Sequence, residues 1–161
     1  MFFKLKSLSI TNYDSKVMEN VKFLEEIEND EEISNNLSDA TIDLKKSDGV
    51  THLKLGTAYL VKDDENPIGL VRLVKKNSKE HSLSIDIAIH PQYRNMGYGT
   101  ILLSELSDYI LKNSSLIKKI SLDIDGSNRN GAKCAENANF NLEGYVDYPT
   151  SHGHLLYAKR K

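Results

Sequence analysis

Residues 87–100 read IAIHPQYRNMGYGT, and this stretch predicts a strand that runs through a short turn into a helix. The strand has to stop before Pro91, because proline cannot donate to a sheet ladder. Beyond the turn, apolar residues at helical spacing, beginning with Tyr98 and Leu102, predict a helix over residues 97–111. The stretch therefore joins the end of a strand to the N-terminus of a helix.

The start of this helix has the properties of an anion-binding site. The first turn of a helix presents N–H groups without an internal partner, and the macrodipole adds about half a positive charge there. Gly97 and Gly99 let the backbone approach a ligand closely, and Arg94 adds a guanidinium fork. Together these groups suit a diphosphate. The spacing alone leaves one alternative open, which is that the glycines only allow close helix packing, because neither a dinucleotide fingerprint nor a P-loop is complete.

The rest of the chain alternates between strand and helix patterns. Strands are predicted at residues 2–10, 57–62, 68–74, 83–89, 118–124, 140–145 and 154–159. Further helices are predicted from Asp14, as a short element within the acidic tract 25–48, and over 130–138. The strand-helix-strand crossover in the second half predicts a local parallel pairing.

Composition limits the class of protein. The 161 residues, of which 39% are hydrophobic and 27% charged, are typical of one globular domain spanning residues 1–161. The single cysteine, Cys134, excludes an internal disulfide and is expected to be a small buried residue. The net charge of -2 argues against a nucleic-acid partner. No apolar run reaches the roughly 18 residues of a membrane span, and the N-terminus lacks a signal-peptide core, so we expect no membrane and a cytoplasmic location.

The sequence Arg94-x-x-Gly97-x-Gly99, after a strand that ends in Ile-His-Pro, resembles the coenzyme A signature of the GNAT superfamily of acetyl-CoA-dependent N-acetyltransferases. The likeness continues in a helix that starts at Asn128 and closes before Phe140. Its finer arrangement is most similar to the ribosomal-protein N-terminal acetyltransferase branch.

The resemblance and the predicted element order imply a single α/β (α+β) domain. Its sheet would be mixed, mostly antiparallel and splayed, with about seven strands flanked by about four helices. The implied function is transfer of an acetyl group from acetyl-CoA to a primary amine of a small molecule or peptide by direct attack, with no metal. The alternative is an acyl-CoA-binding regulatory module of the same fold with weak or no catalysis.

The resemblance also implies which residues hold the coenzyme. Its pantetheine arm would bond to the backbone of three strand residues, namely Ile87, Ala88 and Ile89. Its diphosphate would be held by the amides of the turn, namely Asn95, Met96, Gly97, Tyr98, Gly99 and Thr100. Arg94 would assist at the diphosphate, Asn128 would meet the pantetheine end, and Arg129 or Lys133 would meet the 3′-phosphate.

A base is needed because attack on a thioester requires a neutral amine. A lysine-like amine with a pKa of about 10.4 is neutral to only about one part in 2,500 at pH 7. A carboxylate, or a water held by one, can accept the proton. Asp123 stands where the ribosomal branch carries a glutamate base and is the first candidate, with Asp86 second and Asp125 third. Each could instead be a solvated strand-edge acid.

The resemblance fails at one catalytic position. The tyrosine that usually meets the leaving thiolate is replaced by Ala135, and the usual Gly-Phe is Asn139-Phe140. A thiol pKa near 8.5 means that this leaving group needs little help. Tyr148 or Tyr145 would reach the site from the last hairpin, unless both only pack on the edge strand.

Three further features bear on ligands and partners. The nine acids of residues 25–48 favour a cationic amine as acceptor, with a solvated surface as the alternative. His152 and His154 have the spacing of a metal pair, but a hairpin loop accounts for them better. His90 is expected to pack at the strand end, and an edge strand in the C-terminal hairpin would allow a homodimer.

Overall fold

The computed structural model describes the chain except for residues 1, 13–15, 29, 31–56, 76–80 and 148–151. Eight described strands form one sheet in the order β1-β2-β3-β4-β5-β6-β8-β7. Every neighbouring pair is antiparallel except β5 and β6, which are parallel. The predicted fold class is confirmed, and the parallel pair lies at the predicted crossover.

The bounds of the elements agree with the predicted ranges in most places. The strands are β1 (Phe2–Lys4), β2 (Ser9–Asn12), β3 (Thr57–Asp63), β4 (Asn66–Val74), β5 (Ser82–Ile89), β6 (Lys119–Asp125), β7 (Asn141–Val146) and β8 (His154–Arg160). The helices are α1 (Met18–Glu28), the 3-10 turn η1 (Pro91–Tyr93), α3 (Tyr98–Asn113) and α4 (Arg129–Asn137). Asp14, the expected helix cap, and most of the acidic tract 25–48 lie outside the described residues.

The prediction of a single first strand over residues 2–10 is wrong, because this segment is a hairpin of β1 and β2. The chain reverses between them, where the Leu5 N–H donates to the Leu8 carbonyl oxygen at 2.8 Å. Both leucines are buried in the core. Two residues three apart on one strand would point to opposite faces, so burying both requires the reversal. This hairpin adds one strand to the seven that the sequence predicts, which gives the eight strands of the described sheet.

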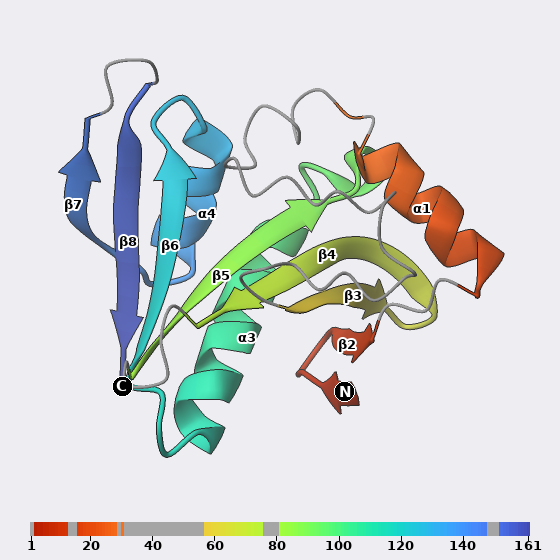
Figure 1. Cartoon of the computed structure of the whole chain (residues 1–161), viewed down its shortest axis with the longest axis horizontal. Helices are drawn as coiled ribbons and strands as arrows, with labels where there is room; N and C mark the ends of the chain where they lie inside the picture. The colour runs from red at the N-terminus through yellow and green to blue at the C-terminus, as the bar shows by residue number, and fades with distance from the viewer. Residues whose placement is uncertain (1, 13–15, 29, 31–56, 76–80, 148–151) are drawn as a thin grey trace.

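Helices cover the two faces of the sheet, as Figure 1 shows. On one face, Leu102 of α3 joins Ile120 of β6 in the larger core cluster, which also includes the buried Ala135 of α4. On the other face, Phe23 and Ile27 of α1 pack against Ala88 of β5. No described helix is long and apolar enough to cross a membrane.

The sheet opens between β5 and β6. These strands pair only from Ser82 to Ser84, where the hydroxyls of Ser84 and Ser121 lie 2.9 Å apart. Beyond that point β5 stays on β4 as far as Ile89, while β6 stays on β8 as far as Asp125. The two strands consequently diverge toward their C-terminal ends (Figure 1), which gives the splay that the sequence predicted.

Candidate functional site

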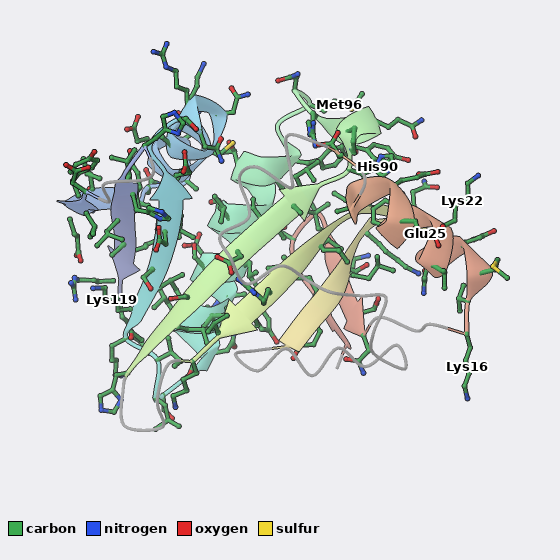
Figure 2. The ribbon with its side chains drawn as sticks, turned by 45° about the horizontal axis from the view of Figure 1, so that its top comes forward. Lys16, Lys22, Glu25, His90, Met96 and Lys119 are labelled. Atoms are coloured by element: carbon green, nitrogen blue, oxygen red, sulfur yellow. The ribbon has the colours of Figure 1, made fainter. Side chains whose placement is uncertain are left out.

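A cleft of about 500 Å³ lies where β5 and β6 diverge. Its walls come from both strands and from the starts of α3 and α4. Of the residues predicted to hold a coenzyme, it is lined by Ile87, Ala88, Ile89, Arg94, Asn95, Gly97, Tyr98, Gly99, Thr100 and Asn128. Met96 does not line the cleft, and its exposed side chain marks the turn in Figure 2.

The edge of β5 that faces the cleft carries backbone groups of alternate residues. Residues of a strand direct their N–H and C=O groups alternately to the two edges. The His90 N–H donates to the Ile68 carbonyl oxygen of β4 at 2.9 Å, so in this register the backbone groups of Ala88 also face β4. Those of Ile87 and Ile89 therefore face the cleft, where an extended ligand can add as a further strand.

The turn before α3 leaves its N–H groups open. Asn95 and Gly97 have positive φ angles of 59° and 84°, and Gly97 is the N-cap of α3 without a side-chain hydrogen bond. The first helical bond runs from the Ile101 N–H to the Gly97 carbonyl oxygen at 3.0 Å. Among the described residues, none accepts a hydrogen bond from the N–H groups of residues 95–100. The turn therefore presents several donors to one place in the cleft.

The two glycines of the turn serve different purposes. A Cβ atom on Gly97 would meet nothing within 4 Å, so its positive φ is what favours glycine there. A Cβ atom on Gly99 would lie 3.2 Å from Cys134 Sγ and 3.8 Å from Ile87 Cδ1. Gly99 thus allows close packing, which was the alternative interpretation of the motif. Cys134 is half-buried and lines the cleft, so the prediction that it is a buried residue is wrong.

Arg94 contacts a carboxylate that the sequence analysis did not single out. Its Nη2 lies 2.5 Å from Asp30 Oδ1, and both side chains are about four-fifths buried, at 22% and 19% exposure. Asp30 follows the C-terminal end of α1. The guanidinium of the motif is consequently paired within the chain.

His90 attaches α1 to the end of β5 (Figure 2). Its ring stacks on Phe23 at 4.9 Å, and its Nε2 lies 2.8 Å from Glu26 Oε2. Because its Nδ1 accepts from the Gln92 N–H at 3.2 Å, Nε2 carries the proton and donates to Glu26. The packing role expected for His90 is confirmed.

Tyr98 attaches the start of α3 to β3. Its hydroxyl donates to Asp63 Oδ2 at 2.5 Å. This hydrogen bond to a carboxylate raises the pKa of Tyr98, and burial and the carboxylate charge raise it further. The contact fixes the helix start relative to the sheet.

Asp86, the second candidate base, lines the cleft from β5. It stands directly opposite Arg72 of β4, whose Nε donates to Asp86 Oδ2 at 2.8 Å and whose Nη2 contacts the same oxygen. Arg72 is buried, at 6% exposure, and this carboxylate compensates its charge. Asp86 therefore has a structural role.

We expect Asp86→Ala to lower the free energy of unfolding by about 3 kcal/mol, because it leaves the buried Arg72 guanidinium without its carboxylate. Urea denaturation measures this loss. Glu143→Ala is the control, since it removes the shared partner of Lys119 and the exposed Arg160, two partly exposed ion pairs whose loss should together cost about 1 kcal/mol. Equal losses in the two variants would contradict the structural role of Asp86.

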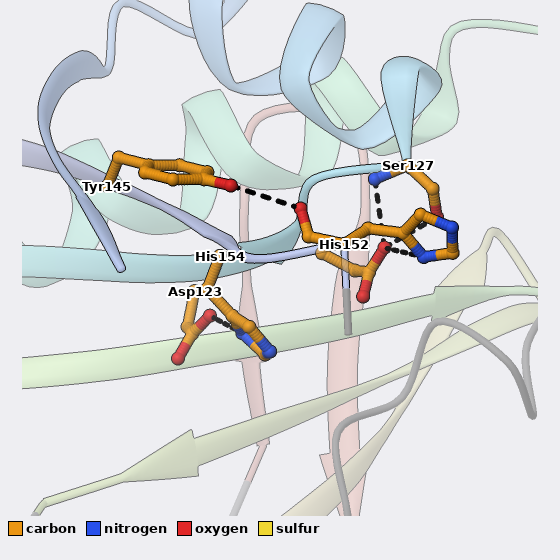
Figure 3. A network of polar contacts seen from close by, with 6 residues as sticks. Asp123, Ser127, Tyr145, His152 and His154 are labelled. Carbon is orange, nitrogen blue, oxygen red and sulfur yellow. Dashed lines mark hydrogen bonds and ion pairs between the residues drawn. The ribbon is translucent and has the colours of Figure 1, made fainter. Parts of the chain in front are cut away.

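Asp123, the first candidate base, lines the cleft from β6 and has a partner that the spacing of the sequence does not reveal. Its Oδ1 lies 2.5 Å from Nδ1 of His154 in β8 (Figure 3). The strand register pairs Asp123 with Leu156 and Asp125 with His154, so the contact is a diagonal one between neighbouring strands. The Asp123 side chain is 51% exposed and that of His154 is 20% exposed.

The side-chain alternation of β6 places Asp123 on the face away from α4. Leu122 stands opposite Tyr157, whose hydroxyl donates to Glu136 of α4 at 2.9 Å. Successive side chains of a strand point to opposite faces. Asp123, the next residue, therefore points to the other face of the sheet, on which α1 packs over β3, β4 and β5.

The same alternation places Asp86 on the face of α1. Ala88 packs with Phe23 of α1, and Asp86 lies two residues before it on the same side of β5. Gly99, at the start of α3, is instead near the Ile87 side chain on the opposite face. A ligand held by the turn and a molecule that meets the two acids would thus approach the opening from opposite sides.

Asp125, the third candidate base, caps a turn. Its Oδ1 accepts from the Ser127 N–H at 2.9 Å and from the Ser127 hydroxyl at 2.5 Å. These hydrogen bonds, with His152 and His154 nearby, lower the pKa of the Asp125 carboxyl. Asp125 does not line the cleft, and its contacts order the approach to α4.

Of the positions considered for the leaving group, the two that the structure describes, Ala135 and Tyr145, do not line the cleft. Ala135 is fully buried in the core, so this position offers no hydroxyl to the cleft. The Tyr145 hydroxyl donates to the His152 carbonyl oxygen at 3.5 Å, and its side chain is mostly exposed. Tyr148 lies outside the described residues.

The start of α4 contributes polar groups to the cleft. Asn128 caps the helix, because its Oδ1 accepts from the Gly131 N–H at 2.9 Å. Of the two cations considered for a 3′-phosphate, Lys133 lines the cleft and Arg129 does not.

The two histidines of the last hairpin do not converge on a common site. His152 Nδ1 lies 3.9 Å from Asp125 Oδ1, and His154 contacts Asp123 instead. Across the described part of the chain, no group of three or more His, Cys, Asp and Glu side chains is arranged to hold a metal ion.

Several solved structures have this fold. The ribosomal L7/L12 alpha-N-protein acetyltransferase RimL in complex with coenzyme A is 13% identical, covers 99% of this chain and 98% of its own, and has a TM-score of 0.76. The spermidine N-acetyltransferase of Vibrio cholerae with CoA and spermine is 20% identical, covers 96% of this chain and 95% of its own, and has a TM-score of 0.72. The aminoglycoside acetyltransferase AAC(6')-Ib with coenzyme A and kanamycin is 19% identical, covers 94% of this chain and 95% of its own, and has a TM-score of 0.73. The TM-scores of these three comparisons show a common fold.

Comparison with curated proteins finds no match. Among known protein families, residues 21–140 match the acetyltransferase (GNAT) family. This range includes most of α1, both walls of the cleft, the open turn and α4. On that match, the chain belongs to the acetyltransferase (GNAT) family.

Proposed function

We propose that the chain is an N-acetyltransferase that moves an acetyl group from acetyl-CoA to a primary amine of a small molecule or peptide. The observation that carries this proposal is the set of open N–H groups at residues 95–100, next to a cleft that has one free strand edge. When bound, the coenzyme supplies an acetyl thioester that an amine can attack. The coenzyme A complexes among the structures of the same fold support the assignment.

The described residues fit the two polar parts of coenzyme A. The open amides and the helix dipole suit the diphosphate, and Lys133 adds a positive charge at the cleft wall. The cleft-facing backbone groups of Ile87 and Ile89 suit the amides of the pantetheine arm. Asn128, at the start of α4, would meet the far end of that arm.

The acceptor amine would enter from the face of α1. There its ammonium group meets Asp123, which we propose as the base, acting directly or through one water. Asp86 is the second candidate, although its pairing with Arg72 occupies one of its oxygens. Tyr148 is our candidate for a hydroxyl near the departing sulfur.

A cationic acceptor is consistent with the acids on that face. Spermine, kanamycin and a ribosomal protein, the molecules named with the structures of this fold, all carry amines. Spermidine, kanamycin and a short basic peptide with a free N-terminus therefore form the test panel. Release of free thiol from acetyl-CoA, with acetylated product identified by mass spectrometry, supports the proposal.

The second candidate function is a coenzyme-binding regulatory module of the same fold. The burial of Ala135, which leaves the cleft without a hydroxyl at that position, is the observation that favours it. Tight binding of coenzyme A in calorimetry, without thiol release on any member of the panel, would support the module instead.

We expect Asp30→Asn to tighten coenzyme A binding by up to about fivefold, because the diphosphate competes with Asp30 for Arg94 and a partly exposed ion pair is worth at most about 1 kcal/mol. Calorimetric titration measures the Kd. Glu25→Gln, which removes one charge from an exposed position on α1, is the control and should leave the Kd unchanged. An unchanged Kd in Asp30→Asn would show that Arg94 stays on Asp30 in the complex.

A homodimer is a further part of the proposal. Strand β7 forms one edge of the described sheet and exposes Leu142 and Tyr145. A second copy could pair with that edge. Sedimentation of the wild type and of Leu142→Lys would show whether association depends on it.

A further inference from the structure

We propose that His154 is a positioning residue for the base Asp123, and that its protonation switches that base off. This inference rests on the proposed acetyl transfer, and it assigns a role to a residue that the resemblance does not include. It starts from the contact of 2.5 Å between His154 Nδ1 and Asp123 Oδ1, at the wall of the cleft (Figure 3).

The contact determines where one proton lies. An imidazole nitrogen and a carboxylate oxygen at this separation need a hydrogen atom between them. When the carboxylate is ionised, that hydrogen belongs to Nδ1, so His154 donates and Asp123 accepts. Because the bond occupies Oδ1, the second carboxylate oxygen, Oδ2, is the atom that can contact an amine or a water.

The half-exposed position of Asp123 explains why it needs a partner. Its side chain is 51% exposed, so without the bond it would be free to change rotamer. His154 is only 20% exposed and belongs to the interior strand β8, which pairs with both β6 and β7. A group held by two neighbouring strands can fix the direction of the carboxylate.

The charged and titratable groups around His154 come from three places within the described residues (Figure 3). Asp123 and Asp125 face it from β6, Tyr145 belongs to β7, and His152 precedes it by two residues. Asp125 is engaged by Ser127. Asp123 is therefore the carboxylate whose charge His154 senses most directly.

The proton balance gives the sign of the pH effect. In the reaction, a proton leaves the ammonium nitrogen of the acceptor and binds Oδ2 of Asp123, which leaves a neutral amine and a neutral carboxyl group. When His154 is itself an imidazolium, its charge stabilises the Asp123 carboxylate and makes it a weaker base. Activity should thus fall as the pH drops through the range in which imidazoles become protonated.

Two substitutions of His154 separate positioning from simple packing. His154→Asn keeps an N–H close to the place of Nδ1 but cannot titrate, whereas His154→Ala removes the donor. With spermidine as acceptor, we expect His154→Ala to lower kcat about tenfold at about pH 8, and His154→Asn to stay within about threefold of the wild type. At about pH 6 the Asn variant should retain more of its activity than the wild type does.

Either of two results would overturn the inference. If the pH profiles of the wild type and His154→Asn have the same shape, His154 does not control the base. If His154→Asn loses as much kcat as His154→Ala, the hydrogen bond has no positioning role. Coenzyme A affinity, measured in parallel, should be unchanged in both variants, because neither the open turn nor the β5 edge is altered.

A readout that does not need activity tests the pair itself. Asp123→Asn removes the neighbouring negative charge, so the titration of the His154 ring protons in NMR should move to lower pH. Asp64→Asn, in the turn between β3 and β4 where asparagine tolerates the positive φ of 50°, should not move it. An unmoved titration in Asp123→Asn overturns the pairing, whereas a moved titration in a wild type that acetylates none of the panel overturns the proposed function instead.

Discussion

Gly97→Val is expected to weaken coenzyme A binding by about a hundredfold. Gly97 has a φ of 84°, a conformation that costs an ordinary L-residue about 1–2 kcal/mol and a β-branched residue more. The turn would relax to another backbone conformation, and its N–H groups would no longer point to one place. Loss of two hydrogen bonds to a charged diphosphate amounts to about 3 kcal/mol, which is about a hundredfold in Kd.

Calorimetric titration with coenzyme A measures this effect, and a second glycine provides the control. Gly144→Val places the same side chain in β7, where a Cβ atom meets only Leu156 at ordinary contact distances of 3.7 Å and more. It should bind coenzyme A like the wild type. Circular dichroism has to show that Gly97→Val is folded. A folded Gly97→Val that binds within about threefold of the wild type would remove the open turn from the binding site.

Asp123→Asn is expected to lower kcat by about a hundredfold to ten-thousandfold, which is the range for removing a general base. The amide cannot take a proton from the ammonium group, although its size and its place on β6 are preserved. Coenzyme A binding should be unchanged, because the turn and the β5 edge lie across the opening from this side chain. Steady-state thiol release and calorimetry measure the two quantities separately.

Asp125→Asn is the matched control for Asp123→Asn. It lies two residues away on the same strand face, and an asparagine oxygen can still accept from Ser127. We expect its kcat to stay within about threefold of the wild type. If both variants lose the same activity, the effect belongs to the charge of this strand end as a whole, and Asp123 is not the base.

Together, the Gly97 and Asp123 substitutions distinguish the enzyme from the binding module. In the enzyme, Gly97→Val removes binding and Asp123→Asn removes turnover while binding persists. In a module, only the first substitution has an effect, because there is no turnover to lose. The outcome thus depends on two sites on opposite faces of the sheet.

The local features around residues 87–100 were predictable from the sequence because they depend on near neighbours. Pro91 stops a strand wherever it stands, and the apolar spacing after Gly97 predicts a helix without knowledge of the rest of the chain. The crossover between β5 and β6 follows from the order of the elements. The first strand was predicted wrongly, because burial of both Leu5 and Leu8 depends on a reversal that alternation alone does not indicate.

Side-chain partners required the tertiary structure. Asp123 and His154 are 31 residues apart, and Arg94 and Asp30 are 64 apart. Neither contact follows from spacing, because strand register and the position of α1 bring the groups together. The burial of Ala135 in the core could not be predicted either, because the helical pattern does not indicate which element packs against that face of the helix.

The sequence by itself determined the element that binds an anion, because backbone conformation and helix ends are set by residues within a few positions of one another. The tertiary structure alone decided which acids face the opening, which of them are paired, and from which side each ligand would approach. Those properties depend on strand pairing and on the divergence of β5 from β6, and such contacts between distant segments exist only once the sheet has formed.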